Sequence, residues 1–75
     1  MTTLDAVSIG GQGVVVNIAG EDDISLRLME MGLVPGTEFS VLGMAPLGDP
    51  LEIALRGYRL SLRRSEAKRI EVTIL

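Results

Sequence analysis

Three consecutive acidic residues, Glu21, Asp22 and Asp23, are the feature of this sequence that could most directly do chemistry. Clustered carboxylates suit hard cations, so this cluster could hold ferrous iron or magnesium. Adjacent acids diverge from one another at the start of a helix, however, and Asp is a favoured N-cap residue whose charge complements the helix dipole. We therefore interpret the cluster as a helix cap and predict no metal site and no cofactor.

The residues that most enzymes use as catalytic groups are largely missing. The 75 residues include no histidine and no cysteine, which removes the commonest general base, the thiolate nucleophile and two common metal ligands. The only tyrosine, Tyr58, lies in a strand pattern, and no triad, phosphate-binding loop or carboxylate pair is present. The sequence therefore predicts a protein that is not an enzyme and has no catalytic residues.

Two apolar residues of a predicted helix indicate a binding surface instead. Leu26 and Met29 point away from the stripe that the helix would bury, where polar residues are usual. Exposed apolar patches often mark interfaces, and methionine adapts well to partner surfaces. A twist of the helix, or a loop folded over it, would cover the same residues. Leu47, at the tip of the loop over residues 45–50, is assigned to the same candidate surface.

Charge is distributed unevenly along the chain. Residues 1–55 hold eight acidic side chains and one basic one, whereas residues 56–75 hold six basic and two acidic ones, for a net charge of −3. An acidic majority argues against general nucleic-acid affinity, which depends on neutralising phosphates. Arg59 and Arg63, in the basic segment, are candidates for contact with an acidic partner. Solvated strand faces would explain the same basic residues.

These residues must be positioned by a first strand and a helix. The run Val14–Ile18 is rich in β-branched residues and predicts a strand with Val14, Val16 and Ile18 on its core face. The helix is predicted over Ile24–Met31, with Ile24, Leu28 and Met31 as its buried stripe. Gly32 suits the left-handed conformation that ends a helix, and Pro35 prevents its resumption.

Beyond the helix the apolar residues recur with period two, which is typical of strands with one face inward. The predicted inward sets are Phe39, Val41 and Gly43; Leu51, Ile53 and Leu55; Tyr58, Leu60 and Leu62; and Ile70, Val72 and Ile74. Arg56-Gly57-Tyr58 leaves room only for a tight hairpin turn. Residues 65–68 predict one helical turn capped by Ser65, and Asp49 is expected to hydrogen-bond within its own loop.

About five strands result, with one short α-helix inserted after the first long strand. Short twisted strands in so small a chain usually close into a barrel, which removes their free edges. We therefore predict an all-β fold, a small SH3-like barrel, with residues 1–75 as a single domain. No stretch approaches the roughly 20 apolar residues that span a bilayer, and no signal peptide is recognisable, so we expect a cytoplasmic protein without membrane insertion.

The spacing of several motifs resembles the FeoA family, ferrous iron transport protein A. The matching segments run in order along nearly the whole chain: Gly13-Val14-Val15, residues 27–33 (Arg-Leu-Met-Glu-Met-Gly-Leu), Pro35-Gly36-Thr37, residues 45–51 (Ala-Pro-Leu-Gly-Asp-Pro-Leu), residues 56–63 (Arg-Gly-Tyr-Arg-Leu-Ser-Leu-Arg), Glu66-Ala67 and Ile70-Glu71-Val72. One residue departs from the pattern, because Leu26 stands where family members often carry an arginine. The resemblance points to a free-standing protein of this type.

The resemblance implies a non-enzymatic accessory of bacterial ferrous iron transport that binds and modulates the membrane transporter FeoB through the transporter's cytoplasmic part. Leu26, Met29, Leu47, Arg59 and Arg63 are then the candidate partner-binding residues. Three alternatives stay open: a regulatory domain related to the C-terminal module of iron-dependent repressors, a barrel that binds ferrous iron directly, and a barrel that binds nucleic acid. We expect no nucleic-acid partner, and a weak homo-oligomer stays open.

Overall fold

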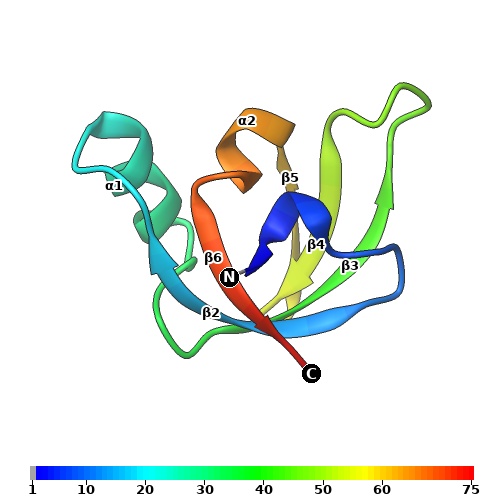
Figure 1. Cartoon of the computed structure of the whole chain (residues 1–75), viewed down its shortest axis with the longest axis horizontal. Helices are drawn as coiled ribbons and strands as arrows, with labels where there is room; N and C mark the ends of the chain where they lie inside the picture. The colour runs from blue at the N-terminus through cyan, green and yellow to red at the C-terminus, as the bar shows by residue number, and fades with distance from the viewer. Residues whose placement is uncertain (1) are drawn as a thin grey trace.

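The computed structural model describes residues 2–75 as one antiparallel sheet curved around an apolar core (Figure 1). The strands are β1 (Thr2–Thr3), β2 (Gln12–Ile18), β3 (Glu38–Met44), β4 (Leu51–Leu55), β5 (Tyr58–Leu62) and β6 (Ile70–Ile74). The helices are a 3₁₀ turn, η1 (Leu4–Ala6), then α1 (Asp23–Glu30) and α2 (Arg64–Ala67). The predicted all-β class, with one helix inserted after the first long strand, is confirmed, and the strand that was not predicted is the two-residue β1.

Backbone pairing does not close the sheet. Its strand order is β1-β6-β2-β3-β4-β5, so β1 and β5 are its two edges and do not pair with each other. Among residues 2–75, β5 pairs only with β4, so the expectation that closure removes the strand edges is wrong at β5. At the other edge Thr2 lies opposite Val72, which brings the first and last strands side by side.

The period of two predicts the core best in the middle of the sheet. Leu51, Ile53 and Leu55 of β4 are all buried, as are Phe39 and Val41 of β3. The prediction fails where strands run past the core: Tyr58 at the start of β5 and Ile74 at the end of β6 are 42% and 53% exposed. Alternation fixes which face a residue occupies, but burial also needs core atoms above that face.

In β2 the predicted core face is wrong for two of three residues. Val15 is buried, Val14 is half-buried and Val16 is 42% exposed, although Ile18 is buried as expected. The register between β2 and β6 shifts between Val15 and Asn17. Such a β-bulge adds one residue to one strand and reverses the alternation beyond it. Val15 and Ile18, three residues apart, therefore both face the core.

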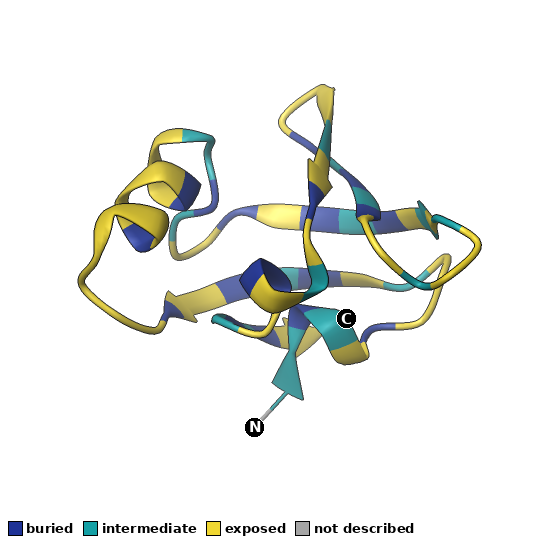
Figure 2. Cartoon of the chain, turned by 90° about the horizontal axis from the view of Figure 1, so that it is seen from above, coloured by how far each residue is buried: buried dark blue, intermediate teal, exposed yellow. Residues whose placement is uncertain are grey.

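Helix α1 is rotated from its predicted orientation. Ser25 and Leu28 are fully buried, whereas Ile24 is 39% exposed and Met31 is only partly buried against the core (Figure 2). Ser25 can occupy a core position because its hydroxyl donates a hydrogen bond to the Ala19 carbonyl, at 2.8 Å. A buried hydroxyl costs little once it is paired. The hydrophobic pattern alone could not predict that a serine replaces Ile24 in the core.

The interpretation of the acidic cluster as a helix cap is confirmed at Asp22. Its Oδ1 accepts a hydrogen bond from the Ser25 backbone N–H at 3.1 Å, and Asp23 is the first helical residue. Arg69 Nη1 also lies 2.7 Å from that oxygen. The hydrogen bond from Arg69, and next the one from Ser25, lowers the pKa of Asp22 to about 2.

The hairpin between β4 and β5 turns through Arg56 and Gly57 alone, with Leu55 opposite Tyr58. Both turn residues have positive φ, 48° and 82°. This is the conformation of a type I′ turn, whose twist matches that of the flanking strands. The predicted tight hairpin turn is confirmed.

Helix α2 starts one residue earlier than predicted and is capped differently. Ser65 lies inside the helix and is not its cap. Instead, Glu66 Oε1 accepts from the Arg63 N–H at 2.9 Å, and Asp49 Oδ1 accepts from the Arg64 N–H at 3.0 Å. Asp49 therefore hydrogen-bonds the helix rather than its own loop. Orphan N–H groups at a helix start need such acceptors, and here one comes from a distant loop.

The bulge in β2 gives a stability prediction. Replacing Val15 by Ala should lower the free energy of unfolding by about 2 kcal/mol, since two buried methyl groups are lost and a small cavity remains. The matched change Val16→Ala, on the exposed side, should cost less than about 1 kcal/mol. Urea unfolding of both variants measures the difference. Equal losses, or a larger loss at Val16, would contradict the bulged register.

The Asp22 cap gives a prediction about pH. Because the folded-state pKa is lowered from 3.8 to about 2, the carboxylate's contribution to stability is complete above the unfolded value and is lost as the pH falls through the folded one. Asp22→Asn keeps the cap but not the charge. The difference in unfolding free energy between wild type and this variant should stay constant above about pH 5 and shrink between about pH 4 and pH 2. Urea titrations across this range test it, and a difference that does not change with pH would refute it.

Candidate partner-binding groove

The exposed apolar residues predicted as one surface lie in two places. Leu26 and Met29 are on the outer side of α1 and are 55% and 39% exposed. Leu47, 97% exposed, is in the loop between β3 and β4, which lies at the opposite end of the molecule from α1 (Figure 1). The prediction that Leu47 belongs to the same surface is therefore wrong, and the loop does not fold over α1.

Antiparallel pairing explains this separation. Helix α1 follows the end of β2, and β3 starts beside β2, with Glu38 opposite Val14. Because β3 runs antiparallel to β2, its far end points away from the end of β2 and so away from α1. Met44 and Leu51, the pair next to the β3–β4 loop, therefore hold this loop at the end of the sheet that is far from α1.

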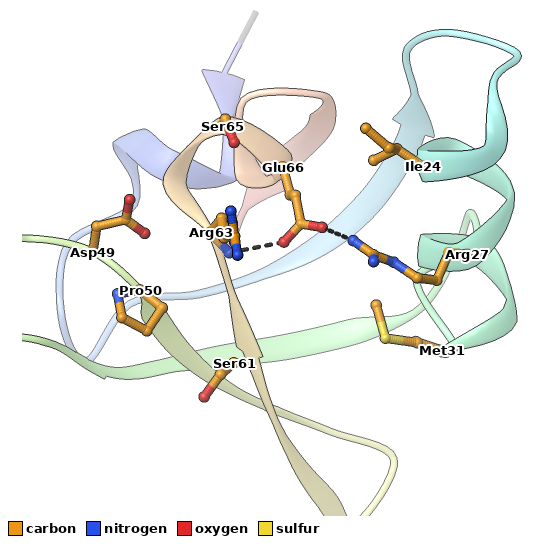
Figure 3. A pocket seen from close by; sticks show the side chains of 9 residues that line it. All are labelled: Ile24, Arg27, Met31, Asp49, Pro50, Ser61, Arg63, Ser65 and Glu66. Atoms are coloured by element: carbon orange, nitrogen blue, oxygen red, sulfur yellow. Dashed lines mark hydrogen bonds and ion pairs between the residues drawn. The ribbon is translucent and has the colours of Figure 1, made fainter.

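A groove of about 1000 Å³ lies between α1 and that hairpin (Figure 3). One side is formed by α1 and Met31, which follows it, and the other side by the end of the β3–β4 loop. The middle is formed by β5, α2 and the residue between them. The lining residues are Ile24, Arg27, Met31, Asp49, Pro50, Ser61, Arg63, Ser65 and Glu66. Of the five predicted partner-binding residues only Arg63 lines it, while Leu26, Met29, Leu47 and Arg59 lie outside it.

An ion pair between Arg27 and Glu66 crosses the groove and ties α1 to α2 (Figure 3). Glu66 is only 9% exposed, and its carboxylate receives hydrogen bonds from the Arg27 guanidinium and the Arg63 N–H. A buried carboxylate needs such partners, because it loses the solvation that water would supply. Sequence reasoning missed this pair, whose members are 39 residues apart. An acid in the first turn of a predicted short helix is the one local signal for it.

The basic residues of the C-terminal segment do not form one face. Arg69 bonds Asp22 and Ser25, Arg64 bonds the carbonyls of Gly48 and Asp5, and Arg56 bonds the Thr37 hydroxyl. These three arginines join elements of the barrel. Arg56 is nevertheless exposed, as are Arg59, whose closest carboxylate is Glu52 at 3.5 Å, and Arg63 and Lys68, which form no ion pair with any residue from 2 to 75.

Metal-ligating groups are not gathered in the part of the chain that the structure describes. Residues 2–75 contain no group of three or more acidic, histidine or cysteine side chains that could hold an ion. Asp22 is occupied by Ser25 and Arg69, and Asp49 and Glu66 are occupied at the start of α2. Over the same residues, no helix is long and apolar enough to cross a bilayer.

Comparison with known proteins gives a consistent family. A model of the FeoA domain matches residues 2–74. An Fe(2+) transport protein A/Fe(2+) transporter FeoB fusion protein of Porphyromonas gingivalis is 38% identical over 72 residues, which is 96% of this chain and 8% of the fusion protein. This chain thus spans less than a tenth of the length of that curated relative.

Solved structures agree in fold along the chain. The FeoA-like protein of Clostridium acetobutylicum has a TM-score of 0.90 and 46% identity, covering 100% of this chain and 91% of that one. FeoA of Stenotrophomonas maltophilia, solved in complex with zinc and described as a prokaryotic SH3 domain protein, has a TM-score of 0.85 and 34% identity, covering 97% and 91%. A manganese-dependent transcriptional repressor, with 22% identity and a TM-score of 0.89, shares the fold over 36% of its length.

The SH3-like architecture predicted from strand periodicity is thereby confirmed. The family model and the relatives in the 34–46% identity range all point to one family, which the fusion protein associates with ferrous iron transport. This chain belongs to the FeoA family.

Proposed function

We propose that this chain is a non-enzymatic, cytoplasmic accessory of ferrous iron transport that acts by binding the cytoplasmic part of an FeoB-type transporter. The observation that carries the proposal is the Porphyromonas gingivalis relative, in which a FeoA part and FeoB are one polypeptide. Covalent linkage keeps two parts at an effective concentration in the millimolar range. Without such a link, a FeoA domain would have to reach the transporter through a binding surface of its own.

The outer face of α1 is the surface best suited to that contact. Leu26 and Met29 are apolar, exposed and adjacent on one helix, and burying them against a partner would remove apolar area from water. The helix is also held firmly from behind, by its Asp22 cap and by the Arg27–Glu66 ion pair. A rigid helix presenting apolar side chains loses little conformational entropy when it binds.

Contact, rather than catalysis, fits the available side chains. The acids that line the groove, Asp49 and Glu66, already accept hydrogen bonds from backbone N–H groups of the α2 region. Both carboxylates thus contribute to holding α2, and the chain has no histidine or cysteine to work beside them. The protein would therefore influence the transporter by changing its conformation or assembly.

Direct binding of ferrous iron is the alternative that one observation favours, because the Stenotrophomonas maltophilia relative was solved with zinc. Calorimetry with ferrous iron under anaerobic conditions separates the two functions. We expect no stoichiometric heat. Micromolar binding that is lost in Asp22→Asn/Asp23→Asn would instead support the metal-binding alternative.

The contact proposal predicts what happens when α1 is made acidic. Leu26→Glu/Met29→Glu should reduce recovery of the FeoB-type transporter from an anaerobic membrane extract by at least about tenfold, since two desolvated carboxylates oppose binding. The same variant should not restore ferrous iron uptake to a strain that lacks the native protein.

Leu47→Glu is the matched control for this experiment. It adds one negative charge, against two in the α1 variant, at a more exposed leucine at the far end of the molecule, and it should leave recovery and uptake unchanged. Circular dichroism and urea unfolding establish that both variants fold. Normal recovery by the folded α1 variant would sink the assignment of this face, and wild-type uptake in the deletion strain under iron limitation would sink the accessory function itself.

A further inference from the structure

The free edge of β5 is a feature that the proposed function does not use. β5 has five residues and, in the described part of the chain, pairs only with β4, whereas the other edge of the sheet, β1, has two residues. An edge strand presents unpaired N–H and C=O groups and is a template for another strand.

The turn geometry identifies which backbone groups are free. The two-residue turn makes Leu55 and Tyr58 a hydrogen-bonded pair, and pairing then alternates along the hairpin. Arg59 and Ser61, opposite Ala54 and Glu52, therefore direct their N–H and C=O groups away from β4. Within residues 2–75, no hydrogen bond is formed by the outward N–H and C=O groups of Arg59 and Ser61.

The free edge has a defined end at each side. Arg63 is next in the same phase, but its N–H donates to Glu66 Oε1 at 2.9 Å and its carbonyl accepts from the Glu66 N–H at 2.9 Å. At the other side the Tyr58 hydroxyl donates to the Met31 carbonyl, which holds the residue after α1 against the start of β5. The open stretch thus runs from Arg59 to Ser61.

The surroundings of this stretch are apolar on one face and cationic on the other. Leu60 and Met31 are partly buried and pack on the core, while Arg59, Ser61 and Arg63 alternate with them on the outward face. The Arg59 side chain is 76% exposed, with Glu52 only at 3.5 Å, and Arg63 forms no ion pair with residues 2–75. Of the acids near this edge, Glu66 is already paired with Arg27, Asp49 accepts from the Arg64 N–H, and Glu52, opposite Ser61, lies 3.5 Å from Arg59.

We propose that the Arg59–Ser61 edge binds an extended acidic segment of a partner protein as an additional strand. Backbone hydrogen bonds to Arg59 and Ser61 would hold the segment, and carboxylates four residues apart would meet Arg59 and Arg63. The residue opposite Leu60 would be apolar. A second copy of this chain is disfavoured as the occupant, because antiparallel pairing of two β5 strands brings the arginines of both copies onto one face.

A peptide tests this with the purified protein and does not depend on any transporter. The probe is an acetylated and amidated Thr-Glu-Val-Thr-Val-Glu-Thr, titrated into ¹⁵N-labelled protein, with a Lys-for-Glu peptide as the charge control. We expect saturable shifts centred on β5 and slowed amide exchange at Arg59 and Ser61. The Lys peptide should bind at least about tenfold more weakly.

Two variants separate strand addition from simple charge attraction. Ser61→Pro removes an outward N–H without touching the β4 pairing and should weaken binding about tenfold relative to Ser61→Ala. Arg59→Glu/Arg63→Glu should reverse the preference between the two peptides, so the idea remains testable if the proline variant does not fold. Equal binding by folded Ser61→Pro, shifts without amide protection, dimerisation of the free protein through β5, or no binding would each overturn the proposal.

Discussion

The pairing of the Glu66 carboxylate is the interaction that links the two helices beside the groove. It is nearly buried, so it must be paired, and its two partners come from different parts of the chain, the Arg27 guanidinium of α1 and the N–H of Arg63 beside α2. The pair with Arg27 ties α1 to α2, beside the contacts that buried Leu28 and Ser25 make with the barrel. The bond to Arg63 ends the free edge of β5. One acid thus links α1, which forms one wall of the groove, to α2 and also limits the length of the adjacent open strand.

Local chemistry in the sequence predicted the parts of the fold that are decided locally. The alternation in β4, the Arg56–Gly57 turn and the Asp22 cap each depend on a few neighbouring residues, and all three are confirmed. The β-bulge after Val15 could not be predicted, because it depends on pairing with β6, more than fifty residues later. The burial of Ser25 depends likewise on a carbonyl at Ala19 that only the folded chain brings near.

The candidate site was less predictable than the fold for the same reason. Exposure of Leu26 and Met29 follows from helical spacing and was anticipated. Leu47 is separated from them because β3 runs antiparallel to β2, and the spacing of residues in the sequence does not reveal strand direction. The basic segment is the clearest case. Arg64 and Arg69 belong to the same basic segment as Arg63, but Arg64 bonds carbonyls of other elements and Arg69 bonds an acid at the start of α1. Charge counts therefore overstate the positive surface that a partner would meet.

The pairing of β1 with β6 has a consequence for how such a domain can be joined to others. Thr2 lies opposite Val72, so both ends of the chain leave the barrel from neighbouring positions. A neighbouring domain attached at either end would be linked to the same patch of surface and would move about nearly the same point. The order of the domains in a fused polypeptide should then matter little for the folding of the barrel. The two orders differ in the direction in which the linker leaves it.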